Sequence, residues 1–102
     1  MPFHGNSYQN EQPHLLYVIY DKETGYVDKY GISDDPVNEN GICERVQEQL
    51  DLFNRIAGWE RFFAEILLRE IPGRRNAREI ETAYIMAYFN EHGHKPPGNK
   101  RF

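Results

Sequence analysis

Cysteine is almost absent from this chain of 102 residues, which contains only Cys43. A single thiol excludes an internal disulfide framework and a cysteine-rich zinc site, and it favours action in a reducing compartment. Long apolar runs are missing as well: the longest hold only a few residues, too few to cross a bilayer, and no secretory signal is recognisable. We therefore expect one globular domain in which Cys43 is a small buried residue.

Basic residues are scarce in the first part of the chain. Residues 1–44 hold eight acids and two bases, whereas residues 45–102 hold ten bases and eight acids. The formal net charge of −4 argues mildly against a nucleic-acid partner, but this asymmetry allows a basic face on an acidic protein. Taken alone, the charges favour the simpler interpretation of a solvated helical surface.

Two strands around a tight turn are predicted at residues 15–21 and 26–33, which are rich in β-branched and aromatic residues. The segment Glu23-Thr24-Gly25 fits a three-residue hairpin loop that ends in a bulge, with Gly25 at positive φ. A loop of even length would put Lys29 on the opposite face from Tyr17. The odd length, which the turn chemistry favours, gives one common face to Tyr17, Ile19, Lys29 and Gly31.

Helical periodicity follows in two segments. Apolar residues recur at helical spacing in residues 41–57, and Gly58 ends this predicted helix. The second predicted helix covers residues 76–93, with Asn76 as N-cap, Glu79 completing a capping box and a glycine at its end.

Residues 60–71, between the two predicted helices, alternate in a way that suits a strand, although the same run also suits a short helix. The bracketing residues, Trp59 and Ile71-Pro72-Gly73, favour the strand. The fold class is therefore α+β: a small mixed three-stranded sheet, in the order β-β-α-β-α, flanked by helices. Residues 1–14 are polar and are predicted to form a flexible N-terminal arm, which leaves residues 15–102 for the domain.

The hairpin resembles the paired signature of the GIY-YIG nuclease superfamily. The run LLYVIY (residues 15–20) is similar to the first half of the signature, with Tyr17 at its tyrosine. The run KYGIS (residues 29–33) is similar to the second half, with Gly31 and Ser33 at motif positions. Two departures are clear: GIY is replaced by LLY, and Lys29 stands where the second tyrosine usually lies.

The later positions of the family pattern appear in order along residues 15–99. Arg45 lies in the first helix after the hairpin, Glu81 lies in a later helix, and Asn99 follows two prolines. Some members place a histidine one helical turn after the arginine, where this chain has Gln49. The ending GHKPPGNK resembles the C-terminal nuclease domains of bacterial polymorphic toxins.

The resemblance implies a metal-dependent endonuclease that hydrolyses DNA, or RNA, as the nuclease tip of a bacterial competition toxin. Such a toxin acts in the cytoplasm of the target cell after delivery within a larger secreted protein, has no membrane partner, and is held inactive at home by an immunity protein. The catalytic residues that the resemblance implies are Tyr17, Lys29, Arg45, Glu81 and Asn99.

Each implied role suits its residue type. A single carboxylate, Glu81, can hold one Mg²⁺ or Mn²⁺, and Arg45 can grip phosphate oxygens as a fork. Tyr17 could serve as general base if Lys29 or the metal lowered its pKa. Asn99 would orient the closing tail.

Structural interpretations stand beside these roles. Tyr17 could be an ordinary strand aromatic, Lys29 an edge-strand charge, and Asn99 a turn residue. Arg45 could be a solvated helix residue, but a cation in the first turn opposes the helix dipole, which favours a functional reason. Glu79 is accounted for by its capping box, which leaves Glu81 for the metal.

The histidines give no metal site, because His4, His14, His92 and His94 lack ligand spacing. The alternative function is a non-catalytic α+β module that binds protein or nucleic acid. An enzyme requires Tyr17, Lys29, Arg45 and Glu81 to converge on one cleft, whereas a binding module does not.

Overall fold

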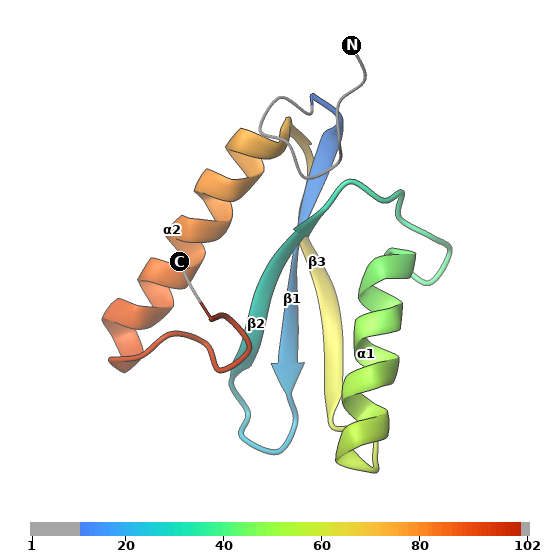
Figure 1. Ribbon diagram of the computed structural model, residues 1–102, viewed down its shortest axis with the longest axis vertical. Helices are drawn as coiled ribbons and strands as arrows, with labels where there is room; N and C mark the ends of the chain where they lie inside the picture. Colours follow the sequence, from blue (N-terminus) through green and yellow to red (C-terminus); the bar gives the residue numbers. More distant parts are fainter. Residues whose placement is uncertain (1–10, 101–102) are drawn as a thin grey trace.

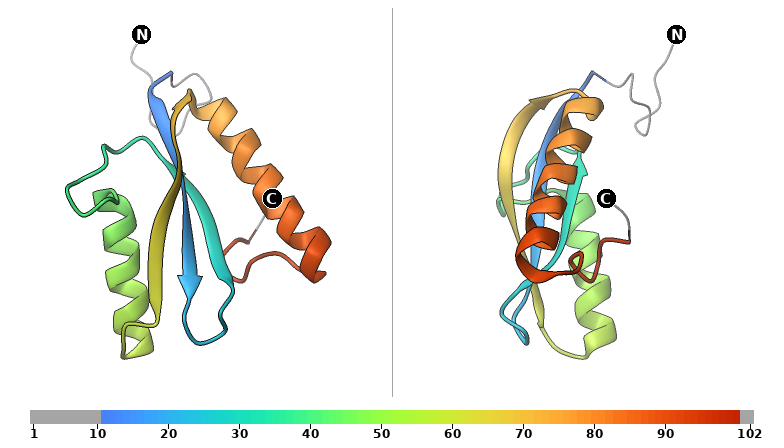
Figure 2. Two further views of the ribbon diagram at one scale, coloured as in Figure 1. Left: turned by 180° about the vertical axis from the view of Figure 1, so that it is seen from behind. Right: turned by 90° about the vertical axis from the view of Figure 1, so that its left-hand side faces the viewer.

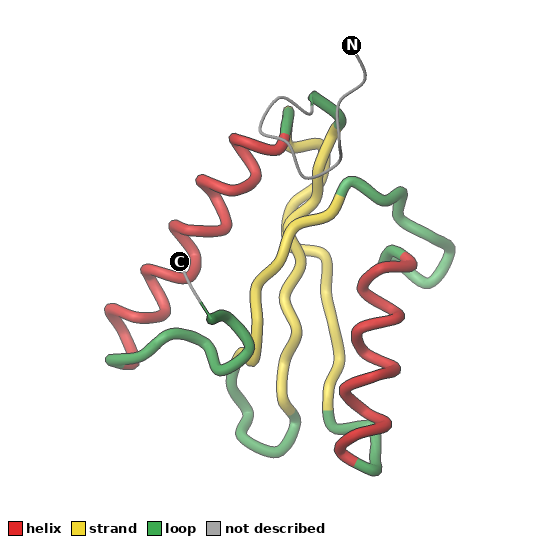
Figure 3. Tube along the Cα trace, in the orientation of Figure 1, coloured by secondary structure: helices red, strands yellow, loops and turns green. Residues whose placement is uncertain are grey.

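A computed structural model describes residues 11–100 of the chain (Figure 1). Residues 1–10 of the predicted arm lie outside the described residues. The elements are β1 (Pro13–Asp21), β2 (Val27–Ser33), α1 (Glu44–Ala57), β3 (Phe62–Pro72) and α2 (Arg74–His92). The predicted α+β class and its β-β-α-β-α order are confirmed, and residues 60–71 form the favoured strand (Figure 3). Within residues 11–100, no helix is both long and apolar enough to cross a bilayer.

The sheet has the strand order β2-β1-β3, and both neighbouring pairs are antiparallel. The expected mixture of strand directions is therefore wrong in this one detail. The connection through α1 makes β2 and β3 point the same way, but β1 lies between them, so the two never pair. β2 is consequently an edge strand, and within the described residues one side of its backbone pairs with no other strand.

The helices cover opposite faces of the sheet, α2 in front and α1 behind in the right-hand view of Figure 2. One apolar cluster joins Leu15, Tyr17 and Ile19 of β1 to α1, and a second joins Leu16 to α2. Because β1 is the central strand and is covered on both faces, its whole run from His14 to Ile19 is buried. That position explains why residues 15–19 are apolar or aromatic without interruption.

The hairpin register confirms the common face predicted for Tyr17 and Lys29, but by another route. The Asp21 amide donates to the Tyr26 carbonyl at 3.0 Å, so the loop holds four residues, 22–25, and not the predicted three. Tyr20 then pairs with Val27, whereas Ile19 pairs with Lys29, which leaves Asp28 as a bulge. This extra residue restores the register that an even loop would have inverted.

Both helices end where the sequence predicts, at Gly58 and Gly93 in the left-handed conformation, and Gly25 of the hairpin loop has the predicted positive φ, at 78°. The first helix begins at Glu44 and not at the predicted residue 41. The predicted capping box at the start of α2 is wrong. Gly73 is the N-cap, at φ 82° and ψ 157°, a conformation that side chains disfavour, so the helix begins before Asn76.

Candidate functional site

Side chains from both helices and two strands meet in one cavity of about 340 Å³, called the cleft below. Four of the five predicted site residues line it: Tyr17, Lys29, Arg45 and Glu81. The cleft lies beside β2, where the open edge of the sheet allows side chains from the α1 layer and the α2 layer to approach each other. These four residues, from β1, β2, α1 and α2, therefore converge on one cleft.

Tyr17 reaches the cleft because Gly31 has no side chain. The two residues are cross-strand partners, and Tyr17 is only 2% exposed. A Cβ built on Gly31 would lie 2.2 Å from Cζ and 2.3 Å from the hydroxyl oxygen of Tyr17. The phenol ring thus crosses directly over the Gly31 backbone toward the edge of the sheet. The glycine of the signature is required by this contact, and φ at Gly31 is not in the positive range.

Gln49 of α1 links Lys29 to Tyr17. The Lys29 ammonium donates to Gln49 Oε1 at 2.9 Å, and Gln49 Nε2 donates to the Tyr17 hydroxyl oxygen at 2.9 Å. An ammonium can only donate, so the carbonyl end of the amide must face Lys29 and the NH₂ end must face Tyr17. With its oxygen accepting from Gln49, Tyr17 can donate its own proton into the cleft.

Glu81 is held by a neighbouring arginine one helical turn earlier. Its side chain is 8% exposed, and Oε1 forms an ion pair with the Arg78 guanidinium. Arg74 lies one further turn back and also lines the cleft, as does Asp34. The cleft thus carries four cationic side chains against two carboxylates, on a chain that is acidic overall.

Burial controls the protonation of the central groups. It raises the pKa of the Tyr17 hydroxyl, against the opposing effects of the Gln49 hydrogen bond and the Arg45 charge. It lowers the pKa of the Lys29 ammonium, assisted by Arg45 and opposed by Glu81. It also raises the pKa of the Glu81 carboxyl, which Arg78 opposes most strongly. Burial therefore outweighs the lowering by Arg45, and the pKa of Tyr17 is raised, contrary to the lowered pKa that a general base would need.

Asn99 does not line the cleft. Its side chain accepts from the Tyr30 amide at 2.8 Å and donates to the Tyr30 carbonyl at 2.9 Å, on the open edge of β2. The neighbouring Gly98 amide donates to the Asp28 carbonyl at 2.7 Å. Both polar ends of the Asn99 side chain are used in this way, so it fastens the tail to the edge strand, as the predicted orienting role requires.

The loop after β2 positions Arg45. Ser33 Oγ accepts from the Asp35 amide at 3.0 Å, and Asp35 Oδ2 accepts from the Arg45 amide at 3.2 Å. Asp35 therefore supplies the carboxylate at the start of α1 that the N-cap residue, Cys43, lacks. The buried position expected for Cys43 is confirmed. The signature serine thus acts on Arg45 through the loop.

Sequence reasoning missed three residues that line the cleft, His14, Arg74 and Arg78, and it missed the linking role of Gln49. Arg74 and Arg78 could have been found, because residues 74, 78 and 81 recur at the spacing of a single helix face. Gln49 lies four residues after Arg45 and shares its face by the same rule. Glu79 is exposed, which supports the choice of Glu81 even though the capping argument for that choice was wrong.

A divalent metal fits the donor set of the cleft. Among residues 11–100, no three His, Cys, Asp or Glu side chains gather so as to hold a metal by themselves. Mg²⁺ is commonly held by one or two carboxylates, several waters and substrate phosphates, so a closed protein cage is not needed. Glu81 keeps Oε2 for such a bond, with Asp34 on the same cavity wall.

Comparison with known proteins places the chain in one family. Neither the curated proteins nor the solved structures give a match. The family described as URI fold toxin 2 matches residues 7–93, which include β1, the whole cleft and all but the tail of the described fold. The chain therefore belongs to the URI fold toxin 2 family of toxin domains.

Proposed function

We propose that this toxin domain is a metal-dependent endonuclease of GIY-YIG type that hydrolyses phosphodiester bonds of DNA, or of RNA. One observation carries the proposal: Tyr17, Lys29, Arg45 and Glu81, far apart in the sequence, line a single cleft. Two further arginines, Arg74 and Arg78, line the same cleft. Phosphodiester hydrolysis depends mostly on positioning and on stabilising charge at phosphorus, which such a cleft can supply.

The cations of the cleft bind the scissile phosphate. Arg45 is exposed, and its guanidinium has no ion-pair partner within the described residues, so it can meet phosphate oxygens as a fork. Arg74 adds positive charge from the first turn of α2. Arg78 is partly neutralised by Glu81 and contributes mainly by orienting that carboxylate.

Glu81 is the residue that would hold Mg²⁺ or Mn²⁺. Such an ion would supply positive charge to the developing phosphorane and lower the pKa of a nearby water. The Arg78 ion pair fixes the rotamer of Glu81, so the carboxylate is already oriented before substrate arrives.

Lys29 and Tyr17 act on the sugar oxygen that leaves phosphorus. Burial lowers the pKa of the Lys29 ammonium, which makes it a better proton donor, and Gln49 fixes its direction. Tyr17 keeps its proton and donates a hydrogen bond, because burial raises its pKa. Asn99 acts at a distance by holding the tail against β2.

The biological setting follows from the toxin family. A nuclease toxin of a bacterium acts on nucleic acid in the cytoplasm of a competing cell, and its producer needs a cognate immunity protein that blocks it. The cleft, with more cations than carboxylates, offers an acidic protein surface a place to bind. DNA is the favoured substrate, with RNA tested beside it.

Cleavage assays with matched variants test the proposal. Purified protein is incubated with plasmid DNA and with total RNA, with Mg²⁺, with Mn²⁺ or with a chelator. We expect cleavage only with metal, and a fall of roughly 100- to 1,000-fold in Glu81→Gln, as when one electrostatic catalytic group is removed. The amide of that variant can still accept from Arg78.

Glu79→Gln is the matched control, since Glu79 is exposed on the same helix. It should cut as fast as the wild-type protein. A folded wild-type protein that cuts neither substrate with either metal would refute the proposal. Retained binding of a labelled oligonucleotide would then identify a non-catalytic binding module.

A further inference from the structure

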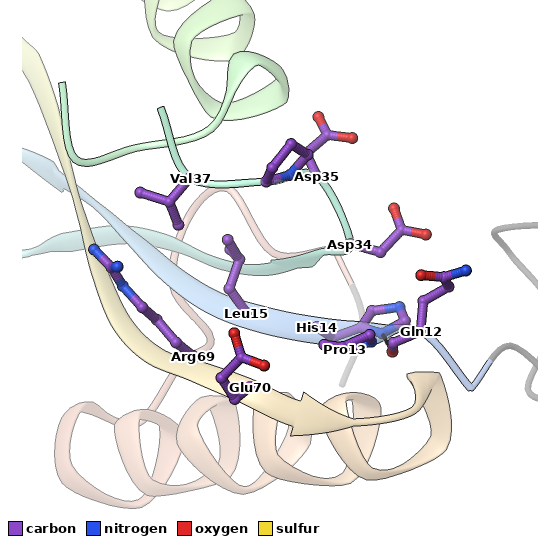
Figure 4. Close-up of a pocket in the computed structure, with 10 residues that line it drawn as sticks. Gln12, Pro13, His14, Leu15, Asp34, Asp35, Val37, Arg69 and Glu70 are labelled. Atoms are coloured by element: carbon purple, nitrogen blue, oxygen red, sulfur yellow. Dashed lines mark hydrogen bonds between the residues drawn. The ribbon is translucent and has the colours of Figure 1, made fainter. Parts of the chain in front are cut away.

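His14 is a buried histidine at the wall of the cleft that the roles above do not use. It lies near the start of β1 and is 2% exposed. The residue lines the cleft and also a second cavity of about 440 Å³, which Gln12 and Asp34 line as well (Figure 4). A buried histidine at the wall of two cavities is a candidate for proton exchange with a bound molecule.

The hydrogen bond of the ring fixes its tautomer. His14 Nδ1 lies 2.7 Å from the Gln12 carbonyl oxygen, which can only accept, so Nδ1 carries the hydrogen. In the neutral imidazole the lone pair is then on Nε2. Among residues 11–100, the hydrogen bond seen for this ring is the one at Nδ1. A ring whose Nδ1 is fixed by a carbonyl and whose Nε2 is left as acceptor is arranged as a proton acceptor.

The strand pairing beside His14 is irregular. His14 pairs with Ile71, and Leu16 pairs with Leu68. An advance of two residues along β1 therefore corresponds to three residues along β3, which makes a bulge in β3. Glu70, inside this bulge, has φ 55°, a left-handed conformation that glutamate rarely adopts. Bulges are frequent beside active sites, where they redirect a side chain.

Tyr17, Glu81 and the cationic side chains of the cleft are poorly suited to take a proton from water. Tyr17 keeps its proton because burial raises its pKa, and its oxygen already accepts from Gln49. Glu81 is paired with Arg78 and is the residue that would hold the metal. Lys29 and the arginines are cations and have no lone pair to offer.

We propose that His14 Nε2 accepts the proton of the water that attacks the scissile phosphate; this assignment rests on the proposed nuclease function. The water oxygen forms a bond to phosphorus as its proton passes to Nε2. The bond from phosphorus to the leaving sugar oxygen breaks, and that oxygen receives a proton from the Lys29 ammonium. The proton gained by His14 and the proton lost by Lys29 balance over one turnover.

The strand register places the two proton-transferring residues suitably. His14 lies beyond the Leu15–Ser33 pair, whereas Lys29 lies opposite Ile19, with the Tyr17–Gly31 pair between them. An in-line displacement needs its base and its acid on opposite sides of phosphorus. His14, Lys29 and Arg45 all line the cleft, and the first two are separated along the strands, so the proposed displacement has the phosphate between them.

The test is the variant His14→Asn, which separates structure from catalysis. The asparagine NH₂ group can take the place of Nδ1–H and keep the hydrogen bond to Gln12, but it offers nothing in place of Nε2. We expect the thermal midpoint and oligonucleotide affinity of the wild-type protein, and cleavage slowed about 100- to 10,000-fold, the range for a general base. Added imidazole should restore part of the activity of His14→Ala.

His94→Asn is the matched control, because His94 Nδ1 also pairs with a carbonyl oxygen, at 2.8 Å, but its ring is exposed outside the cleft. It should leave cleavage unchanged. A substrate with sulfur in place of the leaving oxygen needs no proton at that atom. It should restore cleavage by Lys29→Met and leave His14→Asn slow.

Two outcomes would overturn the assignment while the nuclease stands. One is cleavage by His14→Asn within threefold of the wild-type rate, and the other is its rescue by the sulfur substrate, which would make His14 the acid. If His14→Asn does not fold, rescue of His14→Ala by imidazole decides, and absence of rescue counts against the proposal. A wild-type protein without any nuclease activity would instead refute the proposed function itself.

Discussion

Gly31 shows how one residue can determine the shape of the cleft. Its missing side chain lets the Tyr17 ring cross the β2 backbone, with a hypothetical Cβ only 2.2 Å from the ring. A buried ring this close to backbone cannot give way cheaply, because β1 is packed on both faces. The position of the Tyr17 hydroxyl, and through Gln49 that of Lys29, therefore depends on Gly31.

Replacing Gly31 with alanine should displace Tyr17 and break its hydrogen bond to Gln49. Overpacking of a core site costs about 1–3 kcal/mol, and a misplacement of about 1 Å in a catalytic group costs about 100-fold in rate. We expect both effects in Gly31→Ala, measured by chemical denaturation and by cleavage rate. The control is Gly58→Ala, where a Cβ meets nothing within 4 Å and φ is 82°. It should lose about 1–2 kcal/mol of stability from backbone strain and keep its activity. Equal activities in the two variants would contradict this account of Gly31.

At the scale of elements, the hairpin shows what can and cannot be predicted from the sequence. The strands and the common face of Tyr17 and Lys29 follow from residue types and the glycine turn. The bulge at Asp28 does not, because the loop of four residues and the bulge compensate each other and leave the same pattern as a loop of three. The start of α2 was missed for a similar reason: Gly73 in an unusual conformation replaced a side-chain cap. The proposed role of His14 could not be predicted from the sequence. It depends on the hydrogen bond to the Gln12 carbonyl and on two neighbouring cavities, and no pattern of residues indicates either feature.

The tail after α2 protects the open edge of β2. The Asn99 side chain forms hydrogen bonds with both the backbone amide and the backbone carbonyl of Tyr30. Each such hydrogen bond contributes about 0.5–1.5 kcal/mol to stability. Asn99→Ala should lose about 1–3 kcal/mol of stability and speed hydrogen exchange at the Tyr30 amide, while cleavage falls far less than in Glu81→Gln. Asn90→Ala, an exposed change on α2, is the control and should alter neither quantity. If cleavage fell as far as in Glu81→Gln, Asn99 would have a direct catalytic role.

At the scale of the whole molecule, positive charge is concentrated locally on an acidic chain. The net charge is −4, yet Lys29, Arg45, Arg74 and Arg78 outnumber the two carboxylates in the cleft. If the proposed nuclease function holds, nucleic acid should bind only at the cleft, through few phosphates, and be repelled elsewhere. Such a domain would differ from proteins that bind nucleic acid by a broad basic face.

Binding should consequently depend weakly on salt. Each phosphate contact adds about −0.9 to the slope of log K against log salt, so two or three contacts give a slope of about −2 to −3. The slope is measured by fluorescence anisotropy of a labelled duplex in the Glu81→Gln background, which prevents cleavage.

Arg45→Ala should reduce the magnitude of this slope by about one unit, because that guanidinium lines the cleft. Arg55→Ala removes the same charge from the other end of α1 and should leave the slope unchanged, since the field of a surface charge is screened within about 10 Å. Equal slopes for the two arginine variants would mean that DNA contacts α1 along its whole length and that the cleft alone does not bind the substrate.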